Sequence, residues 1–240
     1  MMATILNVGV TPLTLPALQD VTGNHFFALD LYRRFLEGFC KSTLNVDHPM
    51  FDAQTIEQAG LPDHIKDLET VISERIGGER LCDARYLLNE CIHAVIRSSN
   101  SATAQAYRKK TGLPESLGTA VTIQAMVFGN TGASSGTGVV FSRDPNSGEK
   151  KICGDWISNA QGDDVVAGDS ATSDISVFGA THPSAYEELK LHLEHLEIFY
   201  QDMVDVEFTV DQGKLWILQA RVGKRTARAA SRIAVELANS

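Results

Sequence analysis

Hydrophobic positions in the first half of the chain repeat at the spacing of helices. In "FFALDLYRRFLEGF" the residues Phe27, Leu31, Phe35 and Phe39 are four apart, which predicts one apolar face of a helix. The stretch "ARYLLNECIHAVIRSS" carries a similar stripe. Between them, "DAQTIEQAGLPDHIKDLETVISERIGGER" is polar and is interrupted by glycine and proline. This middle stretch therefore predicts short helices joined by turns.

The pattern changes to that of strands from Gly118 onward. Short runs rich in β-branched and aromatic residues follow one another: "TAVTIQAMVF", "GVVFS", "KKICGDWIS", "DVEFTV" and "KLWILQAR". Two helices are predicted among them, at Pro183–Tyr200 and Lys224–Ala238. We therefore expect an α+β fold: a mainly helical segment over residues 1–112, then an α+β unit over residues 113–240 with a mostly antiparallel sheet and flanking helices.

Composition and charge exclude several classes of function. The formal charge of −9 over 240 residues argues against nucleic acid as a partner. No signal peptide and no apolar stretch long enough to span a bilayer is present, so we expect no membrane contact and a cytoplasmic location. The cysteines lack CxxC spacing, which predicts free thiols rather than a zinc or redox site: Cys40, Cys82, Cys91 and Cys153.

A glycine-rich loop is the first candidate for chemistry. The stretch "GNTGASSGTGVVFSRDPNSGEK" places Gly129, Gly132, Gly136 and Gly138 close together between two predicted strands. That context excludes a Rossmann fingerprint, which precedes a helix, and no Gly-Lys-Ser/Thr completes a Walker A loop. The loop fits a flexible lid whose backbone N–H groups cover the phosphates of a nucleotide. A loose surface loop is the alternative, and the glycine count alone leaves both open.

The second candidate is a hairpin in "DMVDVEFTVDQGKLWILQAR". Asp205 and Glu207 are two apart on one predicted strand, and Gln219 and Arg221 are two apart on the next. A three-residue loop, Asp211–Gly213, is expected between the strands. This register pairs Val210 with Lys214, Glu207 with Ile217, and Asp205 with Gln219. It places all four polar side chains on one face of the sheet and the following residues on the other: Val206, Phe208, Trp216 and Leu218.

Two carboxylates beside an amide and an arginine suit a magnesium–triphosphate site. Oxygen ligands hold Mg²⁺, and a guanidinium neutralises charge on a transferring phosphoryl group. A solvated sheet face with an ordinary ion pair is the alternative. The nearby glycine loop favours the nucleotide interpretation.

The same residues carry a resemblance to a known family. "TGNHFFALDLYRRFLEGF", "SGTGVVFSRDPNSGEK", "NAQGDDVVAG" and "DVEFTVDQGKLWILQARVGKRTARAA" resemble, in order, the nucleotide-binding, ATP-grasp-type domain of the pyruvate, phosphate dikinases. The resemblance implies a phosphotransferase that converts ATP, phosphate and pyruvate to AMP, diphosphate and phosphoenolpyruvate. It places Mg²⁺ on Glu207 and Gln219, and it places ATP against Asp205, Glu207, Gln219 and Arg221, with Arg221 as the catalytic cation. It also places Ser135, Gly136, Thr137 and Gly138 over the triphosphate.

Other parts of the family site are not among these residues. The family carries a Gly-Gly-Lys-Gly stretch, an arginine in Ser-Val-Arg-Ser-Gly and a phosphohistidine domain, none of which matches here. We therefore expect the 240 residues to be inactive alone, with a separate chain supplying the missing groups. Ala133 and Ser134 also replace an acidic or polar pair. The alternative hypothesis is a non-catalytic relic that serves as an interaction module.

Overall fold

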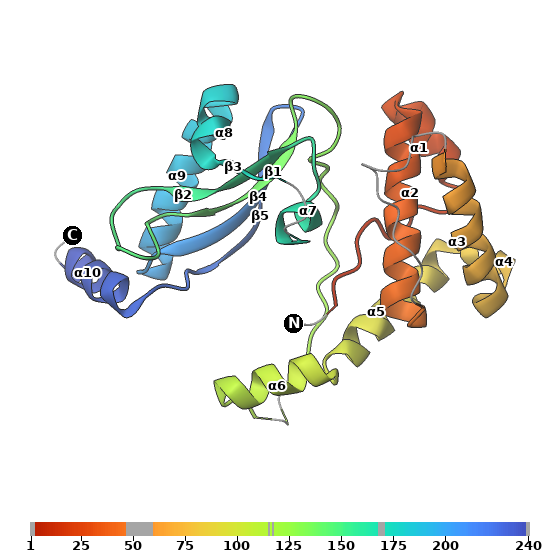
Figure 1. Cartoon of the computed structure of the whole chain (residues 1–240), viewed down its shortest axis with the longest axis horizontal. Coiled ribbons are helices and arrows are strands. Elements are labelled where there is room, and N and C mark those ends of the chain that lie inside the picture. Colours follow the sequence, from red (N-terminus) through yellow and green to blue (C-terminus); the bar gives the residue numbers. More distant parts are fainter. Residues whose placement is uncertain (1–2, 47–59, 115, 117, 168–170, 239–240) are drawn as a thin grey trace. The chain divides into compact units, whose positions relative to one another are not determined.

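The computed structural model describes residues 3–46, 60–114, 116, 118–167 and 171–238 (Figure 1). The chain divides into two compact units, Met1–Met126 and Val127–Ser240. The first unit is helical and the second is built on a sheet. We describe each unit by itself.

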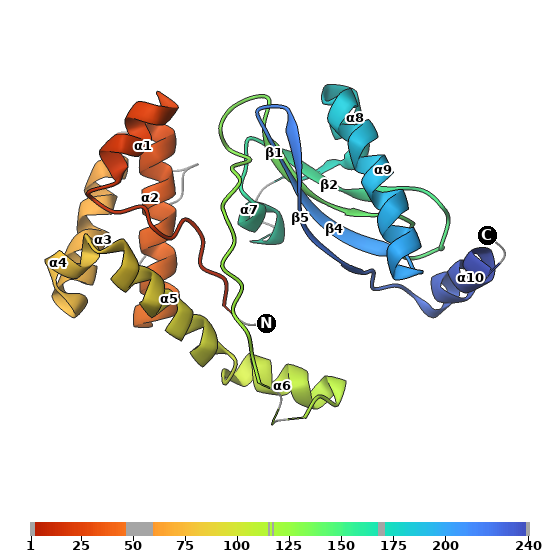
Figure 2. The same cartoon turned by 180° about the vertical axis from the view of Figure 1, so that it is seen from behind.

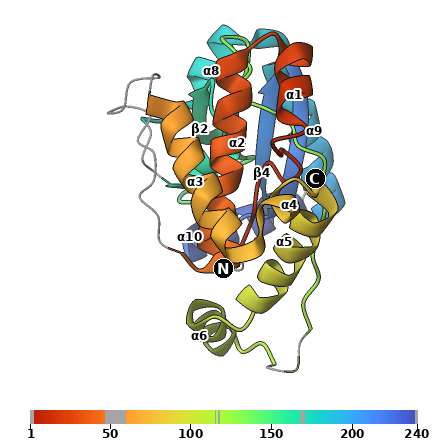
Figure 3. The same ribbon diagram turned by 90° about the vertical axis from the view of Figure 1, so that its right-hand side faces the viewer.

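The first unit consists of helices with recognisable capping residues. Asn24 caps the second helix by accepting a hydrogen bond from the backbone N–H of Phe27, and Asp83 and Ser101 cap later helices in the same way. The elements are α1 (Leu15–Thr22), α2 (His25–Phe39), the π-helical turn η1 (Cys40–Leu44), α3 (Leu61–Ile76), α4 (Gly78–Leu81), α5 (Ala84–Ser98) and α6 (Ala102–Thr111). Figure 3 shows α2 flanked by α1 and α3.

The apolar stripe of α2 forms the core of this unit, as the sequence predicted. Phe27, Leu31, Phe35 and Phe39 are all buried. They pack beside the inward residues of α3, which are Leu61, Ile65, Leu68 and Ile72. The expectation of short helices is wrong for residues 61–76, which form one helix of 16 residues, because its apolar positions keep helical spacing. The earlier part of that prediction, residues 52–59, lies outside the described residues.

A charged cluster is also buried in the helical unit. Arg33 donates from Nε and Nη2 to Asp30 Oδ1 at 3.0 and 2.6 Å, and from Nη1 to Glu37 Oε2 at 2.6 Å. His64 Nε2 lies 2.9 Å from Glu37 Oε1, and Arg34 Nε donates to Asp30 Oδ2 at 2.8 Å. Burial works to raise the pKa of Asp30, but the charges and hydrogen bonds of Arg34 and Arg33 outweigh it and hold that pKa below its usual value.

The second unit contains a five-stranded antiparallel sheet in the order β3-β2-β1-β4-β5. The sheet and the predominance of helices elsewhere confirm the α+β class. Its elements are β1 (Gly136–Phe141), β2 (Cys153–Ser158), α7 (Gly162–Ala167), β3 (Ser173–Asp174), α8 (Ile175–Thr181), α9 (Pro183–Tyr200), β4 (Val204–Asp211), β5 (Lys214–Val222) and α10 (Ala227–Ala238).

The two faces of the sheet differ. One face, here called the core face, packs against α8 and α9 (Figure 2). Its residues include Val140, Trp156, Val206, Phe208 and Val210, all buried. The other face, here called the open face, carries the residues that alternate with these along each strand. One row across it consists of Asp155 of β2, Val139 of β1, Glu207 of β4 and Gln219 of β5.

Two predictions for this half of the chain need correction. The run "TAVTIQAMVF" at residues 119–128 forms no strand, although its composition favours extended backbone. A strand needs a partner for its hydrogen-bond ladder, and the edges of the sheet are β3 and β5 instead. The last helix begins at Ala227 rather than Lys224, because the Thr226 hydroxyl accepts from the Ala229 N–H as a cap.

Candidate functional site

The hairpin β4–β5 positions the candidate residues, and its turn differs from the prediction. Asp211 pairs with Lys214, so the loop has two residues, Gln212 and Gly213, and not three. Both have positive φ, at 49° and 84°. This backbone matches the twist of the two strands, which a two-residue hairpin loop requires.

A bulge in β5 then determines which side chains face which way. Phe208 pairs with Ile217, but Glu207 pairs with Gln219, so Leu218 is an extra residue in β5. Beyond it, Asp205 pairs with Arg221. Paired residues of an antiparallel sheet share a face. The four polar side chains therefore lie together on the open face, as the sequence predicted, although the predicted register was wrong.

The two-residue turn overturns the predicted position of Trp216, which lies between the turn and the bulge. We expected Trp216 on the core face with Phe208. In the structure Trp216 pairs with Thr209, two residues after Glu207, and lies on the open face with 40% of its surface exposed. The core-facing positions of β5 before the bulge are Leu215 and Ile217.

Arg221 and two carboxylates form the centre of the open face. Arg221 Nε donates to Asp205 Oδ2 at 2.8 Å, and its Nη2 lies 3.9 Å from Glu207 Oε1. Asp205 is buried, and its Oδ1 has no hydrogen-bond partner among the described residues. The Arg221 side chain is half exposed. The hydrogen bond from Arg221 to Asp205 raises the pKa of the guanidinium despite some burial, so it stays charged.

The remaining ligand groups on this face are oxygens. Glu207 is partly exposed and Gln219 is exposed, and Asp155, which the sequence analysis did not single out, lies in the same row. Carboxylate and amide oxygens suit Mg²⁺. No group of three or more His, Cys, Asp and Glu side chains in the described part of the chain is arranged to hold a metal ion. A Mg²⁺ here would therefore need additional oxygens from its ligand or from water.

The glycine-rich loop is anchored to the hairpin turn. Thr131 Oγ1 donates to Asp211 Oδ1 at 2.8 Å, and the N–H of Gln212 donates to Ser135 Oγ at 2.9 Å. The N–H of Gly213 donates to the carbonyl of Ser134 at 3.0 Å. These bonds join the loop to β4 and β5 in this structure, and its role as a flexible lid over a nucleotide stays a prediction.

The residues that the resemblance assigns to the triphosphate lie in or next to a central strand of the sheet. Gly136, Thr137 and Gly138 belong to β1, which pairs with β2 on one side and β4 on the other. A Cβ on Gly136 would lie 2.4 Å from the Trp156 ring, and one on Gly138 would lie 2.7 Å from the Phe208 ring. Ser135 and Thr137 are buried. These glycines allow close packing on the core face rather than backbone movement.

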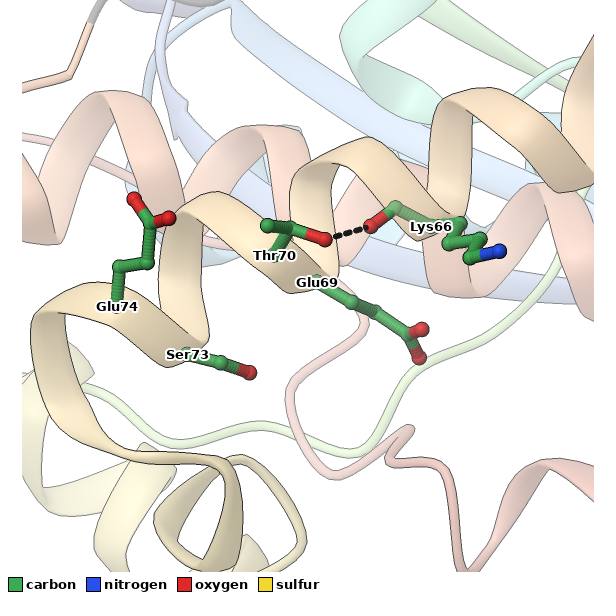
Figure 4. Close-up of a pocket in the computed structure, with 5 residues that line it drawn as sticks. All are labelled: Lys66, Glu69, Thr70, Ser73 and Glu74. Carbon is green, nitrogen blue, oxygen red and sulfur yellow. Dashed lines mark hydrogen bonds between the residues drawn. The ribbon is translucent and has the colours of Figure 1, made fainter.

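A hollow in the helical unit is another candidate for a binding site. It lies along α3 in the helical unit, with a volume of about 410 Å³, and is lined by Lys66, Glu69, Thr70, Ser73 and Glu74. Figure 4 shows that one helix supplies all five side chains. The Thr70 hydroxyl donates to the Lys66 carbonyl of its own helix, and Glu69 accepts from Tyr32. These side chains do not converge on a common point (Figure 4), and this hollow carries no site.

Comparison with known proteins identifies the family. The sequence matches the family described as "Pyruvate phosphate dikinase, AMP/ATP-binding domain" over residues 1–191 and 182–240. The chain belongs to this family. It is 41% identical to the chloroplastic pyruvate, phosphate dikinase of Flaveria trinervia over 254 residues, covering 100% of this chain and 26% of the relative. The Giardia intestinalis pyruvate, phosphate dikinase is 41% identical over 259 residues, covering 99% and 29%.

These identities and coverages confirm the family resemblance that the sequence motifs indicated. The chain spans between a quarter and a third of the length of these dikinases. No helix in the described parts of the chain is both long and apolar enough to cross a membrane. The family description names AMP and ATP as ligands of this domain.

Proposed function

We propose that the open face of the sheet binds the phosphates of Mg·ATP, as the ATP-binding portion of a pyruvate, phosphate dikinase-like phosphotransferase. Glu207 and Gln219 would supply oxygens to Mg²⁺ from adjacent strands. Arg221 would contact the phosphoryl group that is transferred. Asp205 would hold Arg221 in place through Oδ2 and meet the bound nucleotide complex through Oδ1.

The observation that supports this proposal is Asp205 Oδ1, which is buried and has no hydrogen-bond partner in the described part of the chain. A buried carboxylate oxygen without a partner carries a desolvation cost of about 1–3 kcal/mol or more. Asp205 leaves Oδ1 in this state beside a half-exposed guanidinium. A ligand that brings a donor or a cation to this point would remove the cost. Mg²⁺ with its bound water supplies both.

The proposal gives the residues near the glycine loop a different role from the one predicted. In this proposal four residues hold β1 against β4 and do not bind phosphate: Ser135, Gly136, Thr137 and Gly138. Catalysis in the family also uses a lysine, a further arginine and a phosphohistidine. We propose that another chain supplies these groups. A cytoplasmic location stays a prediction, since several relatives are named chloroplastic.

The test is titration of the 240-residue chain with Mg·ATP, followed by its melting temperature. A ligand that binds the folded state raises the melting temperature as its concentration rises. We expect a small rise at millimolar Mg·ATP that Glu207→Ala abolishes. The control is Glu194→Ala, which removes the same charge from α9 on the other side of the sheet.

The outcomes separate the two hypotheses. If Mg·ATP still raises the melting temperature of Glu207→Ala, and the rise needs Mg²⁺, the nucleotide binds elsewhere. The absence of any rise in the unmodified chain would favour the non-catalytic interaction module. We expect no turnover from the chain alone, because loss of one preorganised cation commonly lowers a rate about a thousandfold.

A further inference from the structure

The exposed tryptophan on the open face is unexplained by phosphate binding. The chain has two tryptophans, and Trp156 is buried in the core face against Phe178 and Phe208. Trp216 is 40% exposed on the open face, and contact with water is unfavourable for a large aromatic ring. The ring already has a polar neighbour, since Lys214 Nζ lies 3.9 Å from its centroid.

The position of Trp216 relative to the polar cluster is set by the bulge. Residues 216 and 219 would point to opposite faces in a regular strand, because side chains alternate. The extra residue Leu218 brings Trp216 onto the same face as Gln219 and Arg221. On β4 the matching positions run from Asp205 through Glu207 to Thr209, a length of about 13 Å. The ribose and phosphates of a nucleotide extend over a comparable length.

We infer that Trp216 is the stacking platform for the base of the nucleotide whose phosphates lie on Glu207, Gln219 and Arg221. The nucleotide would lie along β5, with its phosphates at the Arg221 end and its base toward the hairpin turn. A purine ring stacks on an indole ring with favourable dispersion, and the Lys214 cation lies against the same indole. This inference rests on the proposed function, because it takes the phosphate position from it.

The experiment compares a ligand that has a base with one that lacks it. Mg·ATP and Mg·tripolyphosphate are each titrated into the 240-residue chain by calorimetry, and tryptophan emission is recorded in parallel. Trp216→Leu removes the aromatic ring, and Trp216→Phe keeps a ring that can stack. Phe199→Leu is the matched control, because Phe199 is 79% exposed on α9, which packs on the core face.

We expect Mg·ATP to quench the emission of the unmodified chain and Mg·tripolyphosphate to leave it nearly unchanged. Trp156 is buried and serves as the internal reference. Trp216→Leu should weaken Mg·ATP binding by about 5- to 150-fold, the range of base–aromatic stacking, and leave tripolyphosphate affinity within about twofold. Trp216→Phe should retain most of the affinity, and Phe199→Leu should change neither ligand.

Other outcomes overturn the inference in distinguishable ways. If both ligands bind and depend on Glu207, but Trp216→Leu weakens neither or both equally, the base lies elsewhere and only the stacking inference fails. If neither ligand binds, or if binding is indifferent to Glu207→Ala, the phosphate site itself fails and the stacking inference fails with it.

Discussion

Each unit of the chain contains an arginine held by carboxylates, and the two clusters differ in how completely they are paired. In the helical unit Arg33 donates to Asp30 and Glu37, and all three side chains are buried. In the sheet unit Arg221 is half exposed, reaches Asp205 at 2.8 Å and lies 3.9 Å from Glu207. We call these the closed cluster and the open cluster.

The difference separates stability from binding. Nε, Nη1 and Nη2 of Arg33 each donate to a carboxylate oxygen, so the charges of the closed cluster are paired without a ligand. The open cluster leaves Asp205 Oδ1 without a partner among the residues that the structure describes, and Glu207 is partly exposed. Residue types alone do not distinguish the two, because both combine arginine with aspartate and glutamate. The degree of pairing does.

The largest expected effect is that of Arg33→Met in the closed cluster. Removing the guanidinium leaves Asp30 with Arg34 and Glu37 with His64, each short of its buried partner, which should cost about 3 kcal/mol of unfolding free energy. Urea unfolding followed by far-UV circular dichroism measures the loss. Arg85→Met, at an exposed position of α5, is the control and should change stability by about 0.5 kcal/mol or less. A loss at Arg33 no larger than the control would remove the basis of the comparison.

Gly138→Ala tests the framework that holds the open cluster. The new Cβ would lie 2.6 Å from the Asp155 carbonyl oxygen and 2.7 Å from the Phe208 ring, so we expect a loss of about 1–3 kcal/mol. Gly162→Ala is the matched control, because the nearest atom to its Cβ would be Thr137 Oγ1 at 3.9 Å. Tryptophan emission in urea reports on this unit. Equal midpoints for the two variants would restore the flexible-lid hypothesis.

A smaller effect is expected in the pH dependence of the closed cluster. The pKa of Asp30 in the folded chain lies below its ordinary value, so its contribution is complete above the unfolded pKa and is lost as pH falls through the folded pKa. Unfolding midpoints in urea should therefore fall less steeply below about pH 5 in Asp30→Asn than in the unmodified chain. Parallel slopes for the two proteins would show that Asp30 titrates alike in both states.

The smallest effect on stability is expected from Glu207→Gln in the open cluster. Glu207 is 35% exposed and only loosely paired, so the change should alter unfolding free energy by about 0.5 kcal/mol or less. The same substitution at Glu37, which is buried and meets both Arg33 and His64, should cost several times more. Urea unfolding of the two variants side by side measures the ratio. Similar losses would mean that pairing does not separate the clusters.

Much of the fold follows from local patterns in the sequence. The stripe from Phe27 to Phe39 needed only helical spacing, and the alternation in β4 placed Val206 and Phe208 in the core. The run at residues 119–128 was predicted as a strand and is not one, because strand formation depends on a partner that composition does not reveal. The family was evident from its motifs.

The site was predicted only in part, and the turn and the bulge of the hairpin are the reasons. The predicted register was wrong by two residues in this part of the hairpin. A shift of two keeps each side chain on its face, so one face was still predicted to carry Asp205, Glu207, Gln219 and Arg221. Trp216 was assigned to the wrong face because the turn has two residues and not three, and nothing local marks Leu218 as the extra residue that returns Gln219 and Arg221 to the open face. Gly136 and Gly138 show the complementary problem: glycine signals an unusual requirement, but the sequence does not say whether it is mobility or close packing.

The bulge at Leu218 has a second consequence, for association between molecules. β5 is an edge strand of nine residues, so one side of its backbone has no neighbour among the described strands. Such an edge invites pairing with a strand of another chain and, through it, aggregation. The extra residue breaks the regular spacing of N–H and C=O groups and bends the strand. The irregularity that gathers the polar residues also shortens the straight edge that another molecule could extend.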